Sequence, residues 1–405
     1  ILLFSIVSLQ AQVVINEYSA ANYNTTTDNY GEYEDWIELY NPTTSAINLN
    51  GWALTDNISK PTKWTFPSAF NIPANGIVLI YCSSRDEITG TDAHTNFKIT
   101  QTKGSEVLML SNSSGVFQDS IRVLPNQNSH SRGRQTNGAT TWNVFTTATP
   151  GANNANAQLE YATTPVFSQS SGYNTAAVNL TLSSPDPNIT IYYTLNGDAP
   201  DNTSTTYVSA INIATTTVVK AVAYSTTPNI PPSFIDFHTF FINDTHTIPI
   251  LSISGTQVNA LLGNTTTPGQ GTLKPHGTIE WFDENGILID KGTGEYNKHG
   301  NDSWAYGQRG FDYVMRDQFG YNYALKDKLF ITKKRKKFQR VILKAAANDN
   351  FSFEDGAHIR DAYVHHLSQI ADLRMDERSY TSCILYKNGE YWGVYDLREK
   401  ADDHD

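Results

Sequence analysis

The sequence predicts a mainly β, multidomain protein whose last part is an α+β module. Short alternating or apolar runs recur between clusters of turn residues along the first half of the chain, as they do in β-sandwiches. Near the end, a strand-like run, a segment with helical spacing and a hairpin signal follow one another. The length of 405 residues is enough for two to four domains with cores of their own.

Composition and charge argue against some classes of protein. The chain is 39% hydrophobic and 17% charged, which gives no sign of global disorder, and its net charge is −11. This acidic balance argues against a general nucleic-acid binder, which would show a basic face. The two cysteines, Cys82 and Cys383, are roughly 300 residues apart, so we expect them to lie in different domains and not to pair.

The first residues favour export. Residues 1–9, ILLFSIVSL, are apolar but too few to span a bilayer, and Gln10 and Ala11 end the run. We interpret residues 1–11 as the end of a secretory signal peptide cleaved after Ala11, and a buried N-terminal strand is the alternative. No other stretch is long and apolar enough to cross a membrane. The protein is therefore expected to be secreted or at the cell surface, and not to be transmembrane.

Residues 12–153 have the pattern of a β-sandwich. The runs VVINEYS, WIELYN, GWALTDN, GIVLIYCS and EVLMLSN are separated by turn residues. We expect Trp36 and Trp52 to fill the core, and Gly51 and Gly76 to mark turns. An acidic cluster without an Asp-x-Asp-x-Asp loop either binds a cation or forms a solvated edge; it consists of Glu32, Glu34, Asp35 and Glu38.

Four segments of this module resemble the lamin tail domain. They read NEYSAAN, EDWIELYNPTTSAINLNGWALTDN, WTFPSAFNIPANGIVLIYC and GSEVLMLSNSSG. The resemblance implies an immunoglobulin-like β-sandwich of the kind that is common in exported bacterial proteins. It implies an accessory role in adhesion or positioning, and no chemistry.

A linker at 149–164 leads to a second β-module at 165–243. Its strand-like runs are VNLTLSS, ITIYYTLNG, TTTVVKAVAYS and IDFHTFFIN. They resemble the small sandwich at the C-terminus of chitobiase and related hexosaminidases, which is not the catalytic barrel, so no glycosidase activity is implied. Four tyrosines either stack on a sugar or pack within the module; these are Tyr192, Tyr193, Tyr207 and Tyr224.

The third module, 246–405, combines strands with one helix. IPILSIS reads as a strand, GTIEWFDENGILID as a hairpin, and 338–345 as a buried strand. Asp355 is placed to cap a helix over 356–372. In the last hairpin, Asn388-Gly389 supplies the positive φ angles of a type I′ turn. The helix should present one core-facing stripe, made of Ile359, Ala362, Tyr363, His366, Leu367 and Ile370.

Three blocks of this module resemble the CotH kinase family, which is related to bacterial spore coat protein H. They are HGNDSWAYGQRGFDYVMRD (299–317), ILKAAANDN with AHIRDAYVHHL (342–367), and NGEYWGVYDLREK (388–400). Strand, helix, hairpin and an acidic hinge-like segment follow in the order of a protein kinase small lobe. The resemblance implies an α+β kinase-like small lobe that uses ATP and Mg²⁺ to phosphorylate Ser or Thr of secreted proteins.

The resemblance also implies candidate ATP-binding residues. Arg309 stands where the family pattern has a lysine, and Glu399 falls at the hinge where adenine would sit. Lys344 ends a strand just before the helix that carries Asp361, the order in which a kinase places its strand lysine and partner acid. We hypothesise that Lys344 and Asp361 form an ion pair. The alternative is that each of the two side chains pairs with a surface neighbour of its own.

Other polar residues of the module have two interpretations each. Asn348 and Asp349 either cap the loop after the strand or approach the nucleotide, and a structural role is favoured. Three glycines would let the backbone come close to a phosphate, namely Gly300, Gly307 and Gly310. The basic run 333–337 is expected to form a solvated loop, and a phosphate-rich partner is the alternative.

In the CotH family the catalytic aspartate and the metal ligands follow the hinge. We therefore expect them beyond Asp405, expect the sequence to be a fragment with a truncated small lobe, and expect no metal site within it. The implied partners are a secreted or surface protein substrate and a surface polysaccharide, with no nucleic acid. The alternative function is a non-catalytic adhesion, matrix-binding or carbohydrate-binding protein with a degenerate kinase-like domain.

Overall fold

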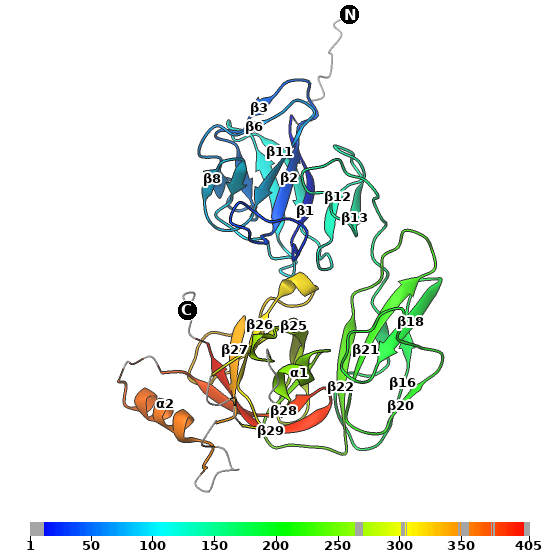
Figure 1. Cartoon of the computed structure of the whole chain (residues 1–405), viewed down its shortest axis with the longest axis vertical. Helices are drawn as coiled ribbons and strands as arrows, with labels where there is room; N and C mark the ends of the chain where they lie inside the picture. Colours follow the sequence, from blue (N-terminus) through cyan, green and yellow to red (C-terminus); the bar gives the residue numbers. More distant parts are fainter. Residues whose placement is uncertain are drawn as a thin grey trace, which may run out of the picture. The chain divides into compact units, whose positions relative to one another are not determined.

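The computed structural model describes residues 12–263, 270–300, 304, 306–346, 349, 356–373, 375 and 377–400. The protein is mainly β, as predicted, with several sheets, one closed barrel and two short α-helices among these residues. The proposed signal peptide, Asn348 and Asp355 lie outside the described part. The chain divides into two compact units, of which the first holds residues up to 160 with 229–231 and 318–320, and the second holds the rest (Figure 1).

The first unit is a β-sandwich. A seven-stranded sheet has the order β13-β12-β1-β2-β7-β9-β8 and a four-stranded sheet the order β11-β10-β4-β5, while β3 and β6 form a separate pair. The strands are β1 (Val14–Ser19), β2 (Trp36–Tyr40), β3 (Ile47–Asn48), β4 (Ala53–Thr55), β5 (Trp64–Thr65), β6 (Asn71–Ile72), β7 (Ile77–Tyr81), β8 (Glu87–Thr89), β9 (Asp92–His94), β10 (Val107–Ser111), β11 (Phe117–Arg122), β12 (Ser131–Arg134) and β13 (Trp142–Phe145).

The core of this unit forms as the aromatic and β-branched runs predict. Trp36 and Trp52 are buried, and Gly51 has a φ of 77°, the left-handed conformation that a turn glycine adopts without strain. Cys82 is buried here and Cys383 in the other unit, and both are free thiols, which confirms that they do not pair.

The acidic cluster of the first unit is split by the fold. Arg85 forms ion pairs with Asp28 at 3.0 Å, Glu32 at 2.5 Å and Glu34 at 3.4 Å. Glu38 lies elsewhere and is fully buried. Basic side chains thus pair with Glu32 and Glu34 of the predicted cluster, whereas Glu38 is bonded by Asn16 and the Gly151 N–H.

The second unit begins with a small β-sandwich. Its five-stranded sheet has the order β15-β22-β21-β18-β19, and β14–β17 and β16–β20 form two further pairs. The strands are β14 (Val166–Phe167), β15 (Gly172–Asn174), β16 (Val178–Leu180), β17 (Leu182–Ser183), β18 (Ile189–Thr194), β19 (Thr205–Thr206), β20 (Ile211–Ile213), β21 (Thr217–Ser225) and β22 (Asp236–Ile242).

The tyrosines of this small sandwich pack within the module. The rings of Tyr192 and Tyr224 meet edge to face across neighbouring strands, with centroids 5.5 Å apart. Tyr193 and Tyr207 pack against the apolar core. These contacts match the packing alternative rather than a row of free stacking faces.

The rest of the second unit is a closed seven-stranded barrel of order β23-β24-β25-β26-β27-β29-β28. Antiparallel pairs follow one another around it, and the parallel pair β23–β28 closes the ring. The sequence predicted most of these strands but not the closure. The elements are β23 (Ile250–Ser254), α1 (Val258–Leu262), η1 (Gln270–Thr272), β24 (His276–Phe282), β25 (Leu288–Lys298), β26 (Phe311–Met315), η3 (Asp317–Phe319), β27 (Arg340–Lys344), α2 (Arg360–Ile370), β28 (Tyr380–Lys387) and β29 (Glu390–Glu399).

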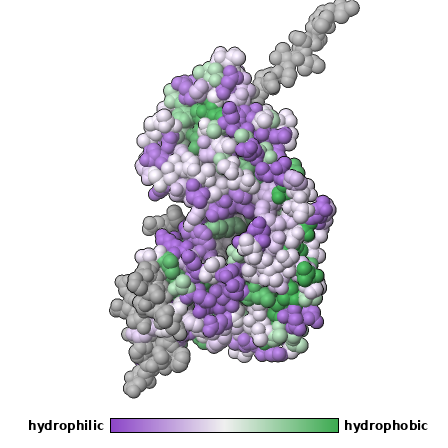
Figure 2. Space-filling model, turned by 45° about the vertical axis from the view of Figure 1, so that its right-hand side comes forward, coloured by the Kyte–Doolittle hydropathy of each residue, from purple (hydrophilic) through white to green (hydrophobic). Residues whose placement is uncertain are grey.

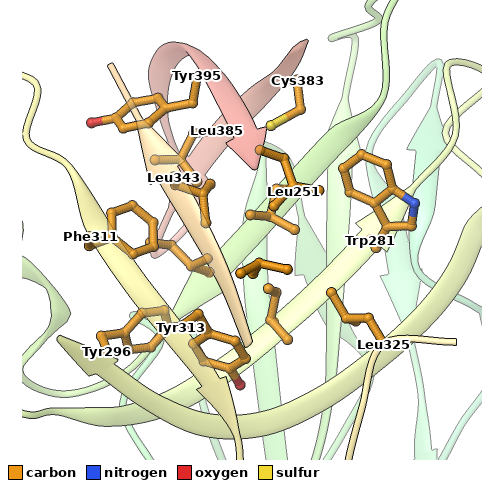
Figure 3. Close-up of a cluster of buried hydrophobic side chains, with 14 of the residues drawn as sticks. Leu251, Trp281, Tyr296, Phe311, Tyr313, Leu325, Leu343, Cys383, Leu385 and Tyr395 are labelled. Carbon is orange, nitrogen blue, oxygen red and sulfur yellow. The ribbon is translucent and has the colours of Figure 1, made fainter. Parts of the chain in front are cut away.

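Alternate residues of each barrel strand fill the interior. Figure 3 shows Phe311 and Tyr313 of β26, Leu343 of β27, and Leu385 and Tyr395 of the last two strands in one apolar cluster. Because successive side chains of a strand point to opposite faces, the even-numbered neighbours of these residues lie on the outer face of the barrel. That face carries the candidate site.

The last hairpin has the predicted turn. Asn388 and Gly389 connect β28 to β29 with φ angles of 51° and 83°. Both values are positive, as a type I′ turn requires.

The helix α2 is shorter than predicted and presents a different face to the protein. Its packed face carries the buried Ala362 with the half-buried His365, Ser368 and Gln369. The predicted core-facing stripe was wrong, because Ala362 is its one buried member; the others are exposed, namely Ile359, Tyr363, His366, Leu367 and Ile370. The helix is held to the barrel by ion pairs on its packed side, so its apolar stripe points away from the barrel.

Figure 2 shows a face that is largely hydrophilic, with hydrophobic residues in small groups. Within the part of the chain that the structure describes, no helix has the length and hydrophobicity needed to cross a membrane.

Candidate nucleotide-binding site on the barrel

The candidate site lies on the outer face of β27 and β29, beside α2. Val341 and Leu343 point into the barrel, so Lys344 points outward by the alternation of the strand. Asp396 of β29 is its partner in the strand register. Charged residues of two strands and one helix therefore meet at this face.

The predicted ion pair is present. The Lys344 ammonium donates to the Asp361 carboxylate, which projects from the first turn of α2. The same carboxylate accepts a hydrogen bond from Arg398 at 2.5 Å, and Arg398 also contacts Asp396 at 3.2 Å. The pair is thus part of a network of two cations and two carboxylates.

Burial distinguishes the two cations. The Arg398 side chain is 3% exposed and lies between two carboxylates, whereas 30% of the Lys344 side chain is exposed. Partial burial raises the pKa of Asp361, but the hydrogen bond from Lys344 and the charges of Arg398 and Lys344 outweigh it, so the pKa lies below its ordinary value. Lys344 is therefore the cation of this network that a phosphate can reach from solvent.

Asp349 holds the start of α2. Its carboxylate accepts hydrogen bonds from the backbone N–H groups of Ala357 at 2.8 Å and Arg360 at 2.9 Å, and the Arg360 guanidinium lies 3.0 Å away. Burial raises the pKa of Asp349, but the backbone hydrogen bonds and the charge of Arg360 outweigh burial, so the pKa lies below its usual value. The favoured structural role of Asp349 is what the structure shows, and it satisfies N–H groups that a helix start leaves unpaired.

Arg309 occupies a buried position. Its side chain is 1% exposed, and its guanidinium lies over the Trp304 ring at 5.1 Å. Burial lowers the pKa of Arg309. A nucleotide could meet this side chain only after local rearrangement, and the phosphate-binding role of Arg309 stays a prediction.

Gly310, next to Arg309, serves the packing of the barrel. A Cβ at this position would lie 3.1 Å from the carbonyl oxygen of His299 and 3.4 Å from that of Leu343. Gly300 has a φ of 85°, while residues 301–303 and 305 of the glycine-containing loop are outside the described part.

Glu399 is the last residue of β29 and is buried. It forms ion pairs with Lys333 at 2.9 Å and Arg335 at 3.0 Å. The basic run 333–337 is therefore tied to the barrel through two of its residues. The adenine-side role of Glu399 stays a prediction.

Two members of the network, Asp396 and Arg398, were not predicted from the sequence. The segment YDLREK alternates apolar and charged residues, which places these two on one face of a strand. A second charged group on the outer face was not predicted from the sequence either. In it, Asp312 contacts His299 at 2.8 Å and Lys400 at 2.9 Å. Burial raises the pKa of Asp312, and the hydrogen bonds from His299 and Lys400 more than offset it, so the pKa is lowered.

The described residues fit a phosphate better than a metal ion. Lys344 offers a partly exposed ammonium held in place by Asp361. Among the residues that the structure describes, no group of three or more His, Cys, Asp or Glu side chains could hold a metal ion. Asp361 and Asp396 are both engaged by Arg398. The part described holds a partly exposed lysine that could contact a phosphate, and no group of side chains that could hold Mg²⁺.

Three family models match the chain in succession. The Lamin Tail Domain matches residues 7–124, the Chitobiase/beta-hexosaminidase C-terminal domain matches 169–230, and the CotH kinase protein family matches 305–405. No curated protein matches the chain. The last match contains all members of the Lys344–Asp361–Arg398–Asp396 network. The chain is thus a multidomain protein in which two β-sandwich domains, similar to the lamin tail and chitobiase C-terminal domains, precede a CotH-like domain.

Proposed function

We propose that this chain belongs to an exported protein whose CotH-like domain transfers a phosphoryl group from Mg-ATP to Ser or Thr residues of secreted or surface proteins. The observation that carries the proposal is the Lys344–Asp361 ion pair between a barrel strand and the following helix, inside the region that the CotH kinase model matches. In phosphoryl transfer most of the protein's work is positioning and charge stabilisation, and a fixed lysine beside the phosphates does both.

In this proposal each residue of the network has its own task. Lys344 binds phosphate oxygens of the nucleotide, and Asp361 orients the ammonium. Arg398, buried between Asp361 and Asp396, keeps the Asp361 carboxylate ionised and in place. ATP with Mg²⁺ supplies the transferable phosphoryl group when bound.

A thermal-shift titration of the complete gene product with ATP, with and without Mg²⁺, tests the proposal. We expect a saturable, Mg²⁺-dependent rise in the unfolding temperature, because a ligand at 100 times its Kd stabilises the folded state by about 2.7 kcal/mol. Lys344→Ala should abolish the rise. Lys328→Ala removes an exposed lysine outside the network and should leave it unchanged.

The second candidate function is a non-catalytic adhesion, matrix-binding or carbohydrate-binding protein. It is favoured by the buried position of Arg309 and by the ion pairs that engage Glu399. In the titration, a folded protein that shows no shift with any nucleotide would support this candidate and contradict the kinase proposal.

Export is the second part of the proposal, and its support is the apolar sequence of residues 1–11. Fractionation of cells that express the complete gene with a C-terminal tag tests it. Recovery of the tagged protein in the medium or on the cell surface is expected, and its retention inside the cell would contradict export.

A further inference from the structure

Two central strands of the small sandwich are buried on both faces. In β22, Phe240 and Ile242 point into the sandwich core, while Phe237, Thr239 and Phe241 are equally buried on the opposite face. The run VVKAVA of β21 is likewise buried at every position. Strands covered on one side alternate between buried and exposed residues, so a second layer must cover these two. That layer is the barrel, beside which β22 runs in Figure 1.

Aromatic residues join the two layers. Phe241 of β22 meets Phe282 of β24 edge to face at 5.1 Å, and Tyr386 of β28 at 4.8 Å. With Ile250 and Ile384 of the barrel they form one buried cluster, against which Tyr173 of the sandwich packs. This cluster is separate from the barrel interior and from the sandwich core.

A buried carboxylate of the barrel is satisfied by the sandwich. Glu280 of β24 is 1% exposed, and it accepts hydrogen bonds from Ser171 Oγ at 2.6 Å, from the Thr239 N–H at 3.2 Å and from Thr239 Oγ1. Thr239 Oγ1 also contacts Ser252 Oγ of β23 at 2.8 Å. A buried carboxylate without such donors is strongly destabilising, so the barrel face requires the sandwich.

Two lysines cross the same interface in opposite directions. Lys220 of β21 is buried, and its ammonium donates to the carbonyl oxygen of Ser254 in the barrel at 3.4 Å. Lys291 of β25 lies 2.5 Å from Asp236 of the sandwich and 4.6 Å from the centre of the Phe237 ring. Each layer therefore supplies a charge that the other neutralises or solvates.

Glycines at the interface allow the two backbones to touch. Gly172 forms a β-bridge with Ile287, and a Cβ on it would lie 2.5 Å from the carbonyl oxygen of Gly286. A Cβ on Gly197 would lie 2.2 Å from the side chain of Asn388, at the tip of the last hairpin. A side chain at Gly172 would press on the backbone of Gly286 and one at Gly197 on the side chain of Asn388, so glycine at both positions lets the two layers approach closely.

We infer that the small sandwich is a structural support for the barrel, with which it unfolds as one cooperative unit, and not a separately folding binding module. The sandwich contacts the β28–β29 hairpin at its tip and at Tyr386, and β29 carries Asp396 and Arg398 of the candidate site. It therefore holds the hairpin that leads into β29, one of the two strands that carry the charge network. This inference does not depend on whether the network binds ATP.

Hydrogen exchange of the full chain, read by mass spectrometry at peptide resolution, tests the inference. Leu180→Ala opens a cavity in the sandwich core, since Leu180 is fully buried there and does not touch the barrel cluster. We expect exchange to accelerate roughly tenfold or more in β18 and β21, and by the same factor in β24 and β28. Acceleration confined to the sandwich strands would overturn the inference.

Two further variants keep the test decisive. Leu39→Ala makes the matched cavity in the core of the first unit and should leave exchange in β24 and β28 unchanged. If Leu180→Ala does not fold, Leu180→Val removes less volume, and the same comparison between sandwich and barrel strands applies. ATP titration of the folded variants tests ATP binding separately, so failure of the kinase proposal can be told apart from failure of this inference.

Discussion

Two buried carboxylates, Glu17 and Glu38, face each other across neighbouring strands of the first unit. They are register partners in the β1–β2 pair, and both are fully buried. Glu38 accepts hydrogen bonds from Asn16 and from the Gly151 N–H, each at 2.8 Å. Glu17 accepts one from the Thr149 N–H at 2.9 Å. The pair thereby holds the segment that follows the last strand of the sandwich.

Burial sets the protonation of this pair. Burial raises the pKa of Glu38 to about 8, and the negative charge of Glu17 adds to this rise. The hydrogen bonds from Asn16 and Gly151 lower the pKa but do not outweigh burial. Burial also raises the pKa of Glu17. The folded state therefore holds a proton on Glu38 over a pH range in which the unfolded chain has lost it.

The stability of the first unit should consequently fall as the pH rises from about 4.5 to about 8. Within that window one group contributes a slope of up to roughly 1.4 kcal/mol per pH unit. Glu38→Gln has no proton to lose, so its unfolding temperature, followed by calorimetry, should decline less steeply, with the remaining slope coming from Glu17. Glu32→Gln, at an exposed position, should follow the wild type. Parallel curves for Glu38→Gln and the wild type would contradict the prediction.

At the scale of elements, strands were easier to predict than the helix. Alternation and an Asn-Gly turn depend on neighbouring residues, so β28, β29 and their connection could be derived from sequence alone. The face that a helix buries depends on what it packs against. In α2 the stripe with most apolar residues is exposed, and the packed face contains Ala362 and the ion pairs of Asp361.

The two faces of α2 should respond differently to substitution. Ala362→Leu forces a larger side chain against the barrel and should cost about 1–3 kcal/mol. Ile370→Ser changes a residue that is 69% exposed to one of similar helix propensity and should stay within about 0.5 kcal/mol of the wild type. Calorimetry of the full chain, followed at the unfolding transition of the second unit, measures the stability change of each variant. A larger loss for Ile370→Ser than for Ala362→Leu would mean that the apolar stripe is buried in solution.

At the scale of the whole molecule, the sequence indicates three modules after the N-terminal segment, whereas the structure has two compact units. Composition marks the linker before the small sandwich. The boundary between the small sandwich and the barrel is crossed by a shared aromatic cluster and by the bonds to Glu280. Proximity in sequence and a change of pattern do not reveal such contacts, because they form between side chains far apart along the chain.

Gly172→Ala should lower the stability of the second unit as a whole. Gly172 has a φ of 136°, and the added Cβ would meet the carbonyl oxygen of Gly286, so we expect a loss of about 1–3 kcal/mol in a single calorimetric transition. Gly104→Ala is the matched control in the first unit, where the added Cβ has open space and the positive φ alone costs about 1 kcal/mol. Separate transitions for sandwich and barrel in Gly172→Ala would contradict the prediction.

The candidate site shows the same division between local and tertiary information. The order of a strand lysine and a helix acid pointed to Lys344 and Asp361, and the structure joins them. Sequence could not show that Arg398 shares Asp361, that Arg309 is buried, or that Lys333 and Arg335 engage Glu399. Each of these depends on which strands become neighbours when the barrel closes.

Local periodicity and turn chemistry are enough to specify the β character of the chain, its turns and the core tryptophans of the first unit. The succession of domains follows from the resemblance to three families. Four features become visible only in the folded chain: the closure of the barrel, the buried face of α2, the charge network around Asp361 and the packing of the sandwich against the barrel. Those features arise from the burial of side chains brought together from distant segments, and burial decides which charges must be paired and which faces must be covered.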